Sequence, residues 1–158
     1  MQNKSRLVKI DLTERLKHRQ EMIDEDFEQK LSEVIDLTSW AARDSNAVEL
    51  KVWSTVLKDF YLVDIETLVQ DNNFNTESVL GQIDIDAQQA KIVENLTKNF
   101  EKDLDLTITA MVAGIYKRNL LTVKTQAALL SCKFGIEMEE ILNPSELNIA
   151  AGIMMGEL

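Results

Sequence analysis

The chain has 158 residues, of which 45% are apolar and 28% are charged. This apolar fraction is too high for a disordered chain, and a chain of this length buries enough surface to be stable without a disulfide or a structural metal. The 17 Lys and Arg stand against 27 Asp and Glu, giving a formal net charge of −10 that disfavours direct binding to nucleic acid.

Five Gly and one Pro supply few turn residues for a fold of short strands, so we expect an all-α fold. The predicted architecture is a single-domain helical bundle over residues 1–158, in which a long N-terminal helix precedes a helical core and a C-terminal cluster of shorter helices. The predicted boundaries are about 12–40, 46–118 and 122–155, respectively.

Apolar side chains at steps of mostly three, four or seven residues predict the long first helix, because such steps place them on one helical face. These residues are Leu12, Leu16, Ile23, Phe27, Leu31, Val34, Ile35 and Thr38. At 1.5 Å per residue, a helix over 12–40 would be about 40 Å long.

Charge is sorted along this helix. Residues 1–20 carry six cations and two anions, which gives +4, and residues 21–36 carry one cation and seven anions, which gives −6. The helix dipole favours the opposite order. An antiparallel second copy would bring the two segments together, and the alternative is a solvated outer helix whose charges have no partner. The candidate partner-binding residues are Arg15, Arg19, Ile23, Asp24, Phe27, Glu28 and Leu31.

The next segments are separated by turn signals. A turn at 43–46 ends the long helix, and Asn46 with Glu49 resembles a capping box that opens the second helix. Asp64 is predicted to cap a short helix that ends at Gln70. The polar, Asn-rich stretch 71–78 is predicted to be a loop.

Alternating apolar and polar residues over 79–86 fit either a short strand or an extended entry into the next helix, and the missing partner strand favours the second. Asp86 is the expected N-cap of that helix. Helical stripes over 87–100 and 103–118 indicate two helices or one bent helix.

A helix over 122–132, a turn at Gly135 and a short helix over 137–142 are expected next. Asn143 and Pro144 then mark the start of the last helix, which is predicted to run to about Met155. Small residues and Met within 148–158 fit a core element, and the alternative is a surface for close helix contact.

The segment 122–141 has the pattern of a helix-turn-helix with Gly135 at the turn. Its second helix would begin with Glu137, Met138, Glu139 and Glu140, which repel phosphate instead of reading bases. We therefore interpret the segment as two helices packed at a tight turn, with no role in binding DNA.

Catalytic and metal-ligating residues are scarce. His18 is the one histidine, lies in a basic run and is expected to be solvated. Cys132 lies in an apolar helix and is expected to be a small buried hydrophobe. One His and one Cys do not form a zinc site, and no acidic cluster has the pattern of a calcium loop. We expect no enzyme activity, no cofactor and no metal.

The run LLTVKTQAAL, Leu120 to Leu129, is similar to a segment near the C-termini of some phage portal proteins. The first helix, which contains FEQKLSEVIDL, resembles their channel-proximal helix. The resemblance covers about ten residues well, and the connection between the two segments is longer here. It implies a viral or phage structural or assembly component, without assigning the chain to that family.

These observations favour a non-enzymatic interaction or assembly protein that acts through protein–protein contacts and forms homo-oligomers. The alternative is an acidic inhibitor or regulator that binds a basic nucleic-acid-processing or transcription protein. No membrane contact is expected, because the longest apolar stretch is too short to span a bilayer. The N-terminus lacks the apolar run of a secretory signal, and we expect a cytoplasmic protein.

Overall fold

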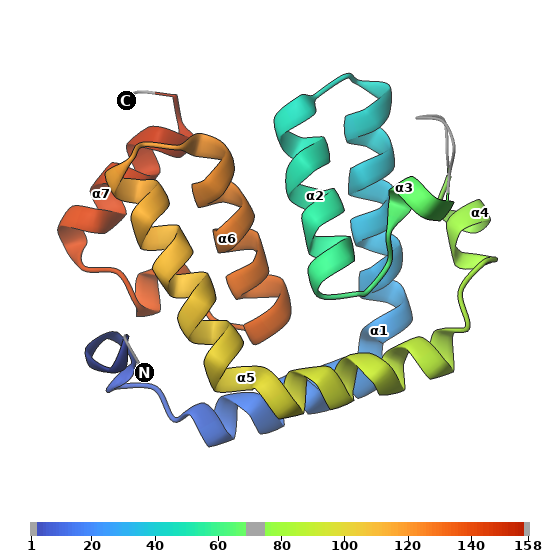
Figure 1. Ribbon diagram of the computed structural model, residues 1–158, viewed down its shortest axis with the longest axis horizontal. Helices are drawn as coiled ribbons and strands as arrows, with labels where there is room; N and C mark the ends of the chain where they lie inside the picture. The colour runs from blue at the N-terminus through green and yellow to red at the C-terminus, as the bar shows by residue number, and fades with distance from the viewer. Residues whose placement is uncertain (1–2, 69–74, 157–158) are drawn as a thin grey trace. The chain divides into compact units, whose positions relative to one another are not determined.

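The computed structural model describes residues 3–68 and 75–156, and the prediction of an all-α fold is confirmed (Figure 1). The described residues contain no strand. Their helical elements are η1 (Lys4–Leu7), α1 (Leu12–Arg43), α2 (Ala47–Asp59), α3 (Ile65–Leu68), α4 (Thr76–Leu80), α5 (Ile85–Tyr116), α6 (Leu120–Phe134), η2 (Met138–Glu140) and α7 (Pro144–Met154), where η denotes a 3₁₀ turn.

The chain forms two compact units. Unit 1 consists of Met1–Arg19 and Thr97–Leu158, and unit 2 consists of Gln20–Leu96. Helices α1 and α5 each contribute one segment to either unit. The expectation that residues 1–158 act as one domain stays a prediction.

Helix α1 confirms the predicted long helix and ends three residues later than expected. It contains one residue with non-helical backbone angles, Asp26, at φ −136° and ψ 24°. After Arg43 the chain turns through Ser45, whose φ is +55°, and the Asn46 side chain accepts a hydrogen bond from the Glu49 amide. This bond confirms Asn46 as the N-cap of α2, which is one half of the predicted capping box. The Glu49 carboxylate accepts a bond from the Trp53 indole.

The core of unit 2 is built on the apolar stripe of α1. Phe27 lies 5.9 Å from Tyr61 between ring centroids, and Tyr61 lies 4.6 Å from Phe60. The fully or nearly fully buried side chains around them include Leu31, Ile35, Val52, Val56, Leu57, Val79, Ile92 and Leu96. Each such side chain stabilises the fold by about 2 kcal/mol relative to exposure, so this stripe explains why α1 is helical here.

The predicted loop at 71–78 is wrong at its C-terminal end, and its part at 71–74 lies outside the described residues. Asn75 and Ser78 form a capping box that opens α4. The Asn75 side chain accepts a bond from the Ser78 backbone amide, and the Ser78 hydroxyl accepts one from the Asn75 backbone amide. Asp64 caps α3 as predicted, and the residues expected to extend that helix to Gln70 are also outside the described range.

The extended entry over 79–86 is replaced by a turn. The amides of Gln82 and Ile83 donate to the carbonyls of Val79 and Leu80. Helix α5 begins at Ile85, and the side chain of Asp84 accepts a bond from the amide three residues later. Asp84 therefore caps this helix, and the prediction of Asp86 as the N-cap is wrong.

Helix α5 spans both predicted helical stripes, and a kink joins its two segments. Its irregular residue is Asn99, with φ −120° and ψ 16°. In unit 1 its C-terminal part packs with α6 through Phe100 and Phe134, whose rings lie 5.4 Å apart at 67°. The buried side chains of this unit include Leu104, Ile108, Met111, Ile115, Val123, Leu130, Ile136, Ile141 and Ile153.

The C-terminal elements follow the prediction except at 137–142. Helix α6 begins after Asn119, which caps it, and Gly135 ends it with φ +66°. The expected short helix is a three-residue 3₁₀ turn, η2, because the chain must become extended at Asn143 before Pro144. The second helix of a helix-turn-helix is therefore not formed.

Helix α7 confirms the predicted cap. The side chain of Asn143 and that of Glu146 form a capping box, and Pro144 lies in the first turn. Ala150, Gly152 and Ile153 are buried, whereas Ala151 and Met155 are exposed, so one face of this segment belongs to the core.

Candidate protein-interaction surfaces

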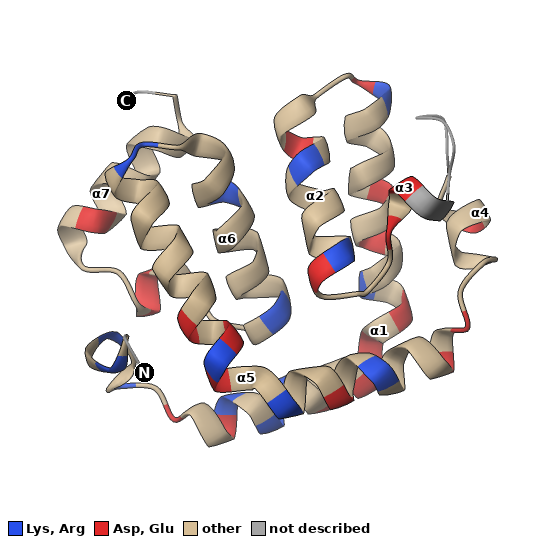
Figure 2. Ribbon diagram, viewed as in Figure 1, with Lys and Arg blue, Asp and Glu red and all other residues tan. Residues whose placement is uncertain are grey.

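The two units differ strongly in charge. Unit 2 contains 5 Lys and Arg against 17 Asp and Glu, which gives −12, whereas unit 1 contains 12 against 10, which gives +2. Figure 2 shows the charged positions among the described residues. The net charge of −10 is thus carried by one unit. The sequence shows how charge is sorted along α1, but only the fold shows which distant segments belong to the same unit.

The apolar members of the predicted partner-binding set lie in the core of unit 2. Ile23, Phe27 and Leu31 are 2%, 4% and 0% exposed. The chain itself covers them, because the stripe that fits a partner helix also fits α2 and α5. Their role in binding a partner stays a prediction, and it would require this core to open.

The two arginines of that set belong to unit 1 and contact its C-terminal segment. Arg15 forms an ion pair with Glu140 and also donates to the Gly135 carbonyl over 3.2 Å. Its hydrogen bond holds the pKa of Glu140 below the ordinary value. Arg19 donates to the carbonyls of Cys132 and Lys133 over 2.6 and 3.3 Å. This cation lies where the dipole of α6 favours positive charge.

The remaining predicted residues, Asp24 and Glu28, are exposed. Asp24 lines a groove of unit 2 together with Asp86 and Glu94, and the side chains of Ala90 and Val93 are its apolar part. Gln89 donates to the Ile23 carbonyl over 3.3 Å beside it. No Lys or Arg is among the described lining residues, so the groove suits a basic group.

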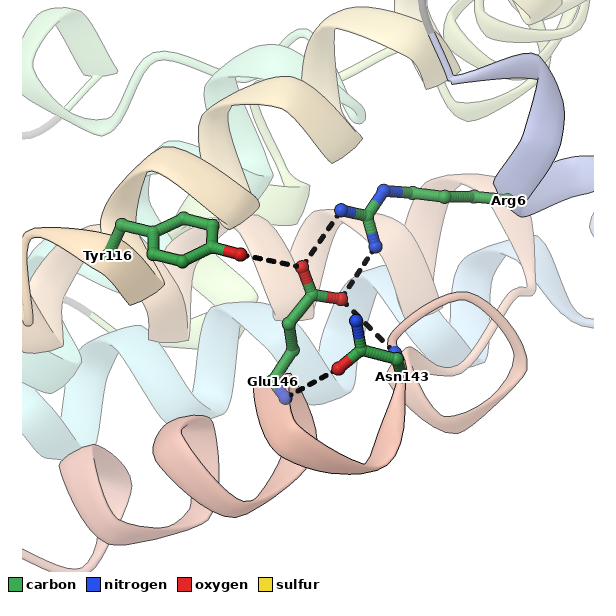
Figure 3. Close-up of polar contacts among 4 residues, drawn as sticks. All are labelled: Arg6, Tyr116, Asn143 and Glu146. Carbon is green, nitrogen blue, oxygen red and sulfur yellow. Dashed lines mark hydrogen bonds and ion pairs between the residues drawn. The ribbon is translucent and has the colours of Figure 1, made fainter.

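A polar cluster that the sequence did not predict lies around Glu146 in unit 1 (Figure 3). This carboxylate is 2% exposed and accepts two bonds from Arg6, over 2.6 and 2.8 Å. The Tyr116 hydroxyl lies 3.5 Å away, and the Asn143 amide donates over 3.1 Å. The sequence contains no sign that Arg6, 140 residues away, would reach Glu146.

The cluster is built to hold the N-terminal segment. The hydrogen bonds that Arg6 donates to Glu146 lower the pKa of the carboxyl and raise the pKa of the guanidinium, against the opposing effect of burial. Asn3 adds three bonds to Asp105 and one to Thr109. The polar groups of this cluster bond to one another and to other groups of the protein, so we interpret the cluster as structural.

An exposed face of α1 in unit 2 carries large apolar side chains. Gln29, Glu33, Leu37 and Trp40 follow one another at steps of four, four and three residues, and all four are exposed. Trp40 is 58% exposed and Leu37 is 37% exposed. We call this set the Trp40 face. The prediction used Trp40 only as the end of a helix, although its position outside the apolar stripe is a signal of exposure.

A groove in unit 1 has an apolar lining. It has a volume of about 700 Å³ and is bounded by the start of α1 and by the irregular part of α5 at Asn99. Its apolar side chains are Leu12, Leu16, Phe100 and Leu106, and Lys98, Glu101, Lys102 and Asp105 are its charged ones. We call it the α1–α5 groove. Leu106 is 59% exposed, which is unusual for a leucine.

The residues considered for catalysis or metal binding are dispersed. His18 is exposed, as predicted, whereas Cys132 is half-buried and not fully buried. Among residues 3–68 and 75–156, no group of three or more His, Cys, Asp or Glu is placed to hold a metal ion. Within the same ranges, no helix is long and apolar enough for a membrane span.

Comparison with protein families, with curated proteins and with solved structures finds no match to this chain.

Proposed function

We propose that this protein is a non-enzymatic assembly protein that works through protein–protein contacts, including contacts between copies of itself. The observation that carries the proposal is the charge difference between its units, −12 against +2. Two copies of unit 2 repel each other, as do two whole chains of −10 each, whereas the excess cations of unit 1 attract unit 2 of another copy. Complementary charge of this kind sets orientation and raises association rates.

The contact between copies is expected to differ from the antiparallel pairing of first helices. That pairing would use Ile23, Phe27 and Leu31, which are buried, and Arg15 and Arg19, which already bind groups of unit 1. Exposed groups of the two units are therefore the better candidates.

Sedimentation velocity of the full chain tests the proposal. We expect the mass to rise with protein concentration at about 50 mM salt and to return toward 18.0 kDa at about 500 mM salt, where screening shortens the range of charge interactions. A chain that stays monomeric at about 200 µM protein and low salt, where screening is weakest, contradicts self-association.

Two double variants distinguish an effect of the acids in unit 2 from a general effect of losing negative charge. Glu21→Gln with Glu25→Gln removes two exposed acids from unit 2, and Glu101→Gln with Glu139→Gln removes two from unit 1. The first pair should weaken association, and the second should leave it unchanged or strengthen it. Equal weakening by both pairs would argue against the assignment to unit 2.

The second candidate function is an acidic inhibitor or regulator of a basic nucleic-acid-processing or transcription protein. The groove of Asp24, Asp86 and Glu94 favours it, since a basic side chain bound there would meet three acids and the apolar surface of Ala90 and Val93. It predicts that a labelled Lys- and Leu-containing peptide binds with strong salt dependence. Asp24→Asn with Glu94→Gln should remove this binding, while the Glu101 and Glu139 pair should not.

A further inference from the structure

We propose that the Trp40 face of one copy inserts into the α1–α5 groove of a second copy. This inference rests on the proposed function and names the surfaces of the self-contact. Both surfaces are exposed apolar features of the described residues, and each lies in a different unit. An assembly that joins them places an acidic unit against the unit with positive net charge.

The Trp40 face has the chemistry of an interface anchor. Tryptophan is enriched among residues whose truncation costs the most binding energy, and its burial removes about 150 to 250 Å² from water. Trp40 lies near the C-terminal end of α1, one residue before Ala41, which is buried in unit 2. The backbone that carries it is therefore fixed by the core, so little order must be gained on binding.

The groove offers the matching apolar surface. Phe100 is buried, and Leu12 and Leu16 are half-buried beside it. Phe100 also packs against Phe134 in the core, whereas Leu12 and Leu16 remain half-buried beside the open groove. An indole ring placed there would cover Leu106 as well.

Charge at the rim agrees with this pairing. Lys98 and Lys102 are exposed and one helical turn apart, and neither has an ion-pair partner among the described residues. Glu33 and Asp44 are exposed on either side of Trp40 along the chain. Glu33 Oε2 lies 3.5 Å from Lys30 Nζ. An exposed ion pair of this kind contributes little to stability, so Glu33 can pair with a lysine of a second copy instead.

Asp105, one of the acids that line the groove, already accepts hydrogen bonds within unit 1. Asp105 accepts hydrogen bonds from Asn3 at 2.8 and 2.9 Å, so its charge is partly compensated within unit 1. Glu101 is the other acid among the described lining residues, and it would repel an acidic partner. Its replacement provides a variant that should strengthen the contact.

Complementation between two variants tests the inference. Trp40→Ala removes the inserted side chain and leaves the groove intact, whereas Leu106→Glu blocks the groove and leaves Trp40 intact. Both positions are exposed, so the fold should persist, which far-UV circular dichroism checks. We expect each variant alone to associate at least tenfold more weakly than the unmodified chain.

An equimolar mixture of the two variants should form a one-to-one pair of twice the 18.0 kDa chain mass, because one intact face then meets one intact groove. Met155→Glu is the control, since it makes the same change at a 71% exposed residue of unit 1 outside the groove. It should associate like the unmodified chain. Glu101→Gln should associate more tightly.

The outcomes separate this inference from the proposed function. If the unmodified chain associates and both variants do so equally well, the inference is wrong and self-association stands. If each variant is monomeric and the mixture also stays monomeric, Trp40 and Leu106 do not contact each other across copies, and the inference is again overturned. If the unmodified chain is monomeric throughout, self-association and this inference fail together.

Discussion

The Arg6 guanidinium and the Glu146 carboxylate form a two-bond ion pair between residues 140 positions apart in the chain, at 2.6 and 2.8 Å. Glu146 also closes the capping box of α7 with Asn143. One carboxylate thus accepts a hydrogen bond from the backbone amide at the start of α7 and also binds Arg6 of the N-terminal segment. Both functions depend on its charge, because a neutral side chain accepts weaker bonds.

Removing one member of this pair should destabilise unit 1. Arg6→Ala leaves the buried carboxylate of Glu146 without its main partner, and we expect a loss of about 2 kcal/mol in the free energy of unfolding. Urea denaturation measures it. Lys9→Ala, at an exposed position of the same segment, is the control and should change stability by less than about 0.5 kcal/mol. Equal effects of the two substitutions would contradict the role of the pair.

Stability should fall in acid through the same carboxylate. The pKa of Glu146 in the folded chain lies below its ordinary value of 4.5, chiefly through the bonds from Arg6. The folded state therefore binds fewer protons than the unfolded state, and the stabilisation present above that value is lost as the pH falls through the folded pKa.

Glu146→Gln cannot titrate, so it should remove this part of the pH dependence. The difference in unfolding free energy between the unmodified chain and the variant should be largest at about pH 6 and should shrink toward about pH 3. Urea titrations at several pH values measure it. A difference that stays constant with pH would mean that Glu146 has the same pKa folded and unfolded.

Phe27→Asp should unfold unit 2. The ring is buried and lies 5.9 Å from that of Tyr61, so an aspartate there would place a charge in the core without a partner. We expect a loss above about 4 kcal/mol, visible as lost helical circular dichroism and a lower melting temperature. Glu28→Ala, at the exposed neighbouring position, should melt like the unmodified chain. Unchanged melting of the Phe27 variant would mean that α1 does not bury this face.

The crossing of α5 and α6 depends on Gly114. A β-carbon at this position would lie 2.8 Å from Thr122 Cγ2, which is too close for two carbon atoms. Alanine is about 1 kcal/mol better than glycine within a helix, yet we expect Gly114→Ala to lower stability by about 1 kcal/mol, because overpacking costs more.

A second substitution checks the cause of that loss. Thr122→Ser deletes the contacting methyl group, so it should restore part of the stability lost in Gly114→Ala. Thermal melts of the two single variants and the double variant form a double-mutant cycle. We expect the double variant to be more stable than the sum of the two single effects predicts. Additive effects would show that the contact with Thr122 does not cause the loss.

Local features of the sequence predicted the elements well. The spacing from Leu12 to Thr38 predicted α1, because a helical face repeats every three or four residues whatever lies against it. Asn46, Gly135 and the pair Asn143 and Pro144 predicted helix ends, since their side chains or backbone angles act within a few residues. The predicted loop was wrong at α4, because the side chains of Asn75 and Ser78 cap a short helix there.

The sequence by itself determined an all-α protein with a long first helix and an uneven charge, because these are properties of composition and short-range spacing. The tertiary structure decided which apolar face is covered, since the stripe with Phe27 lies in a core and Trp40 remains exposed. It also decided that Arg6 meets Glu146 and that −12 of the charge belongs to one unit. These are contacts between distant segments, and only packing of the whole chain brings such segments together.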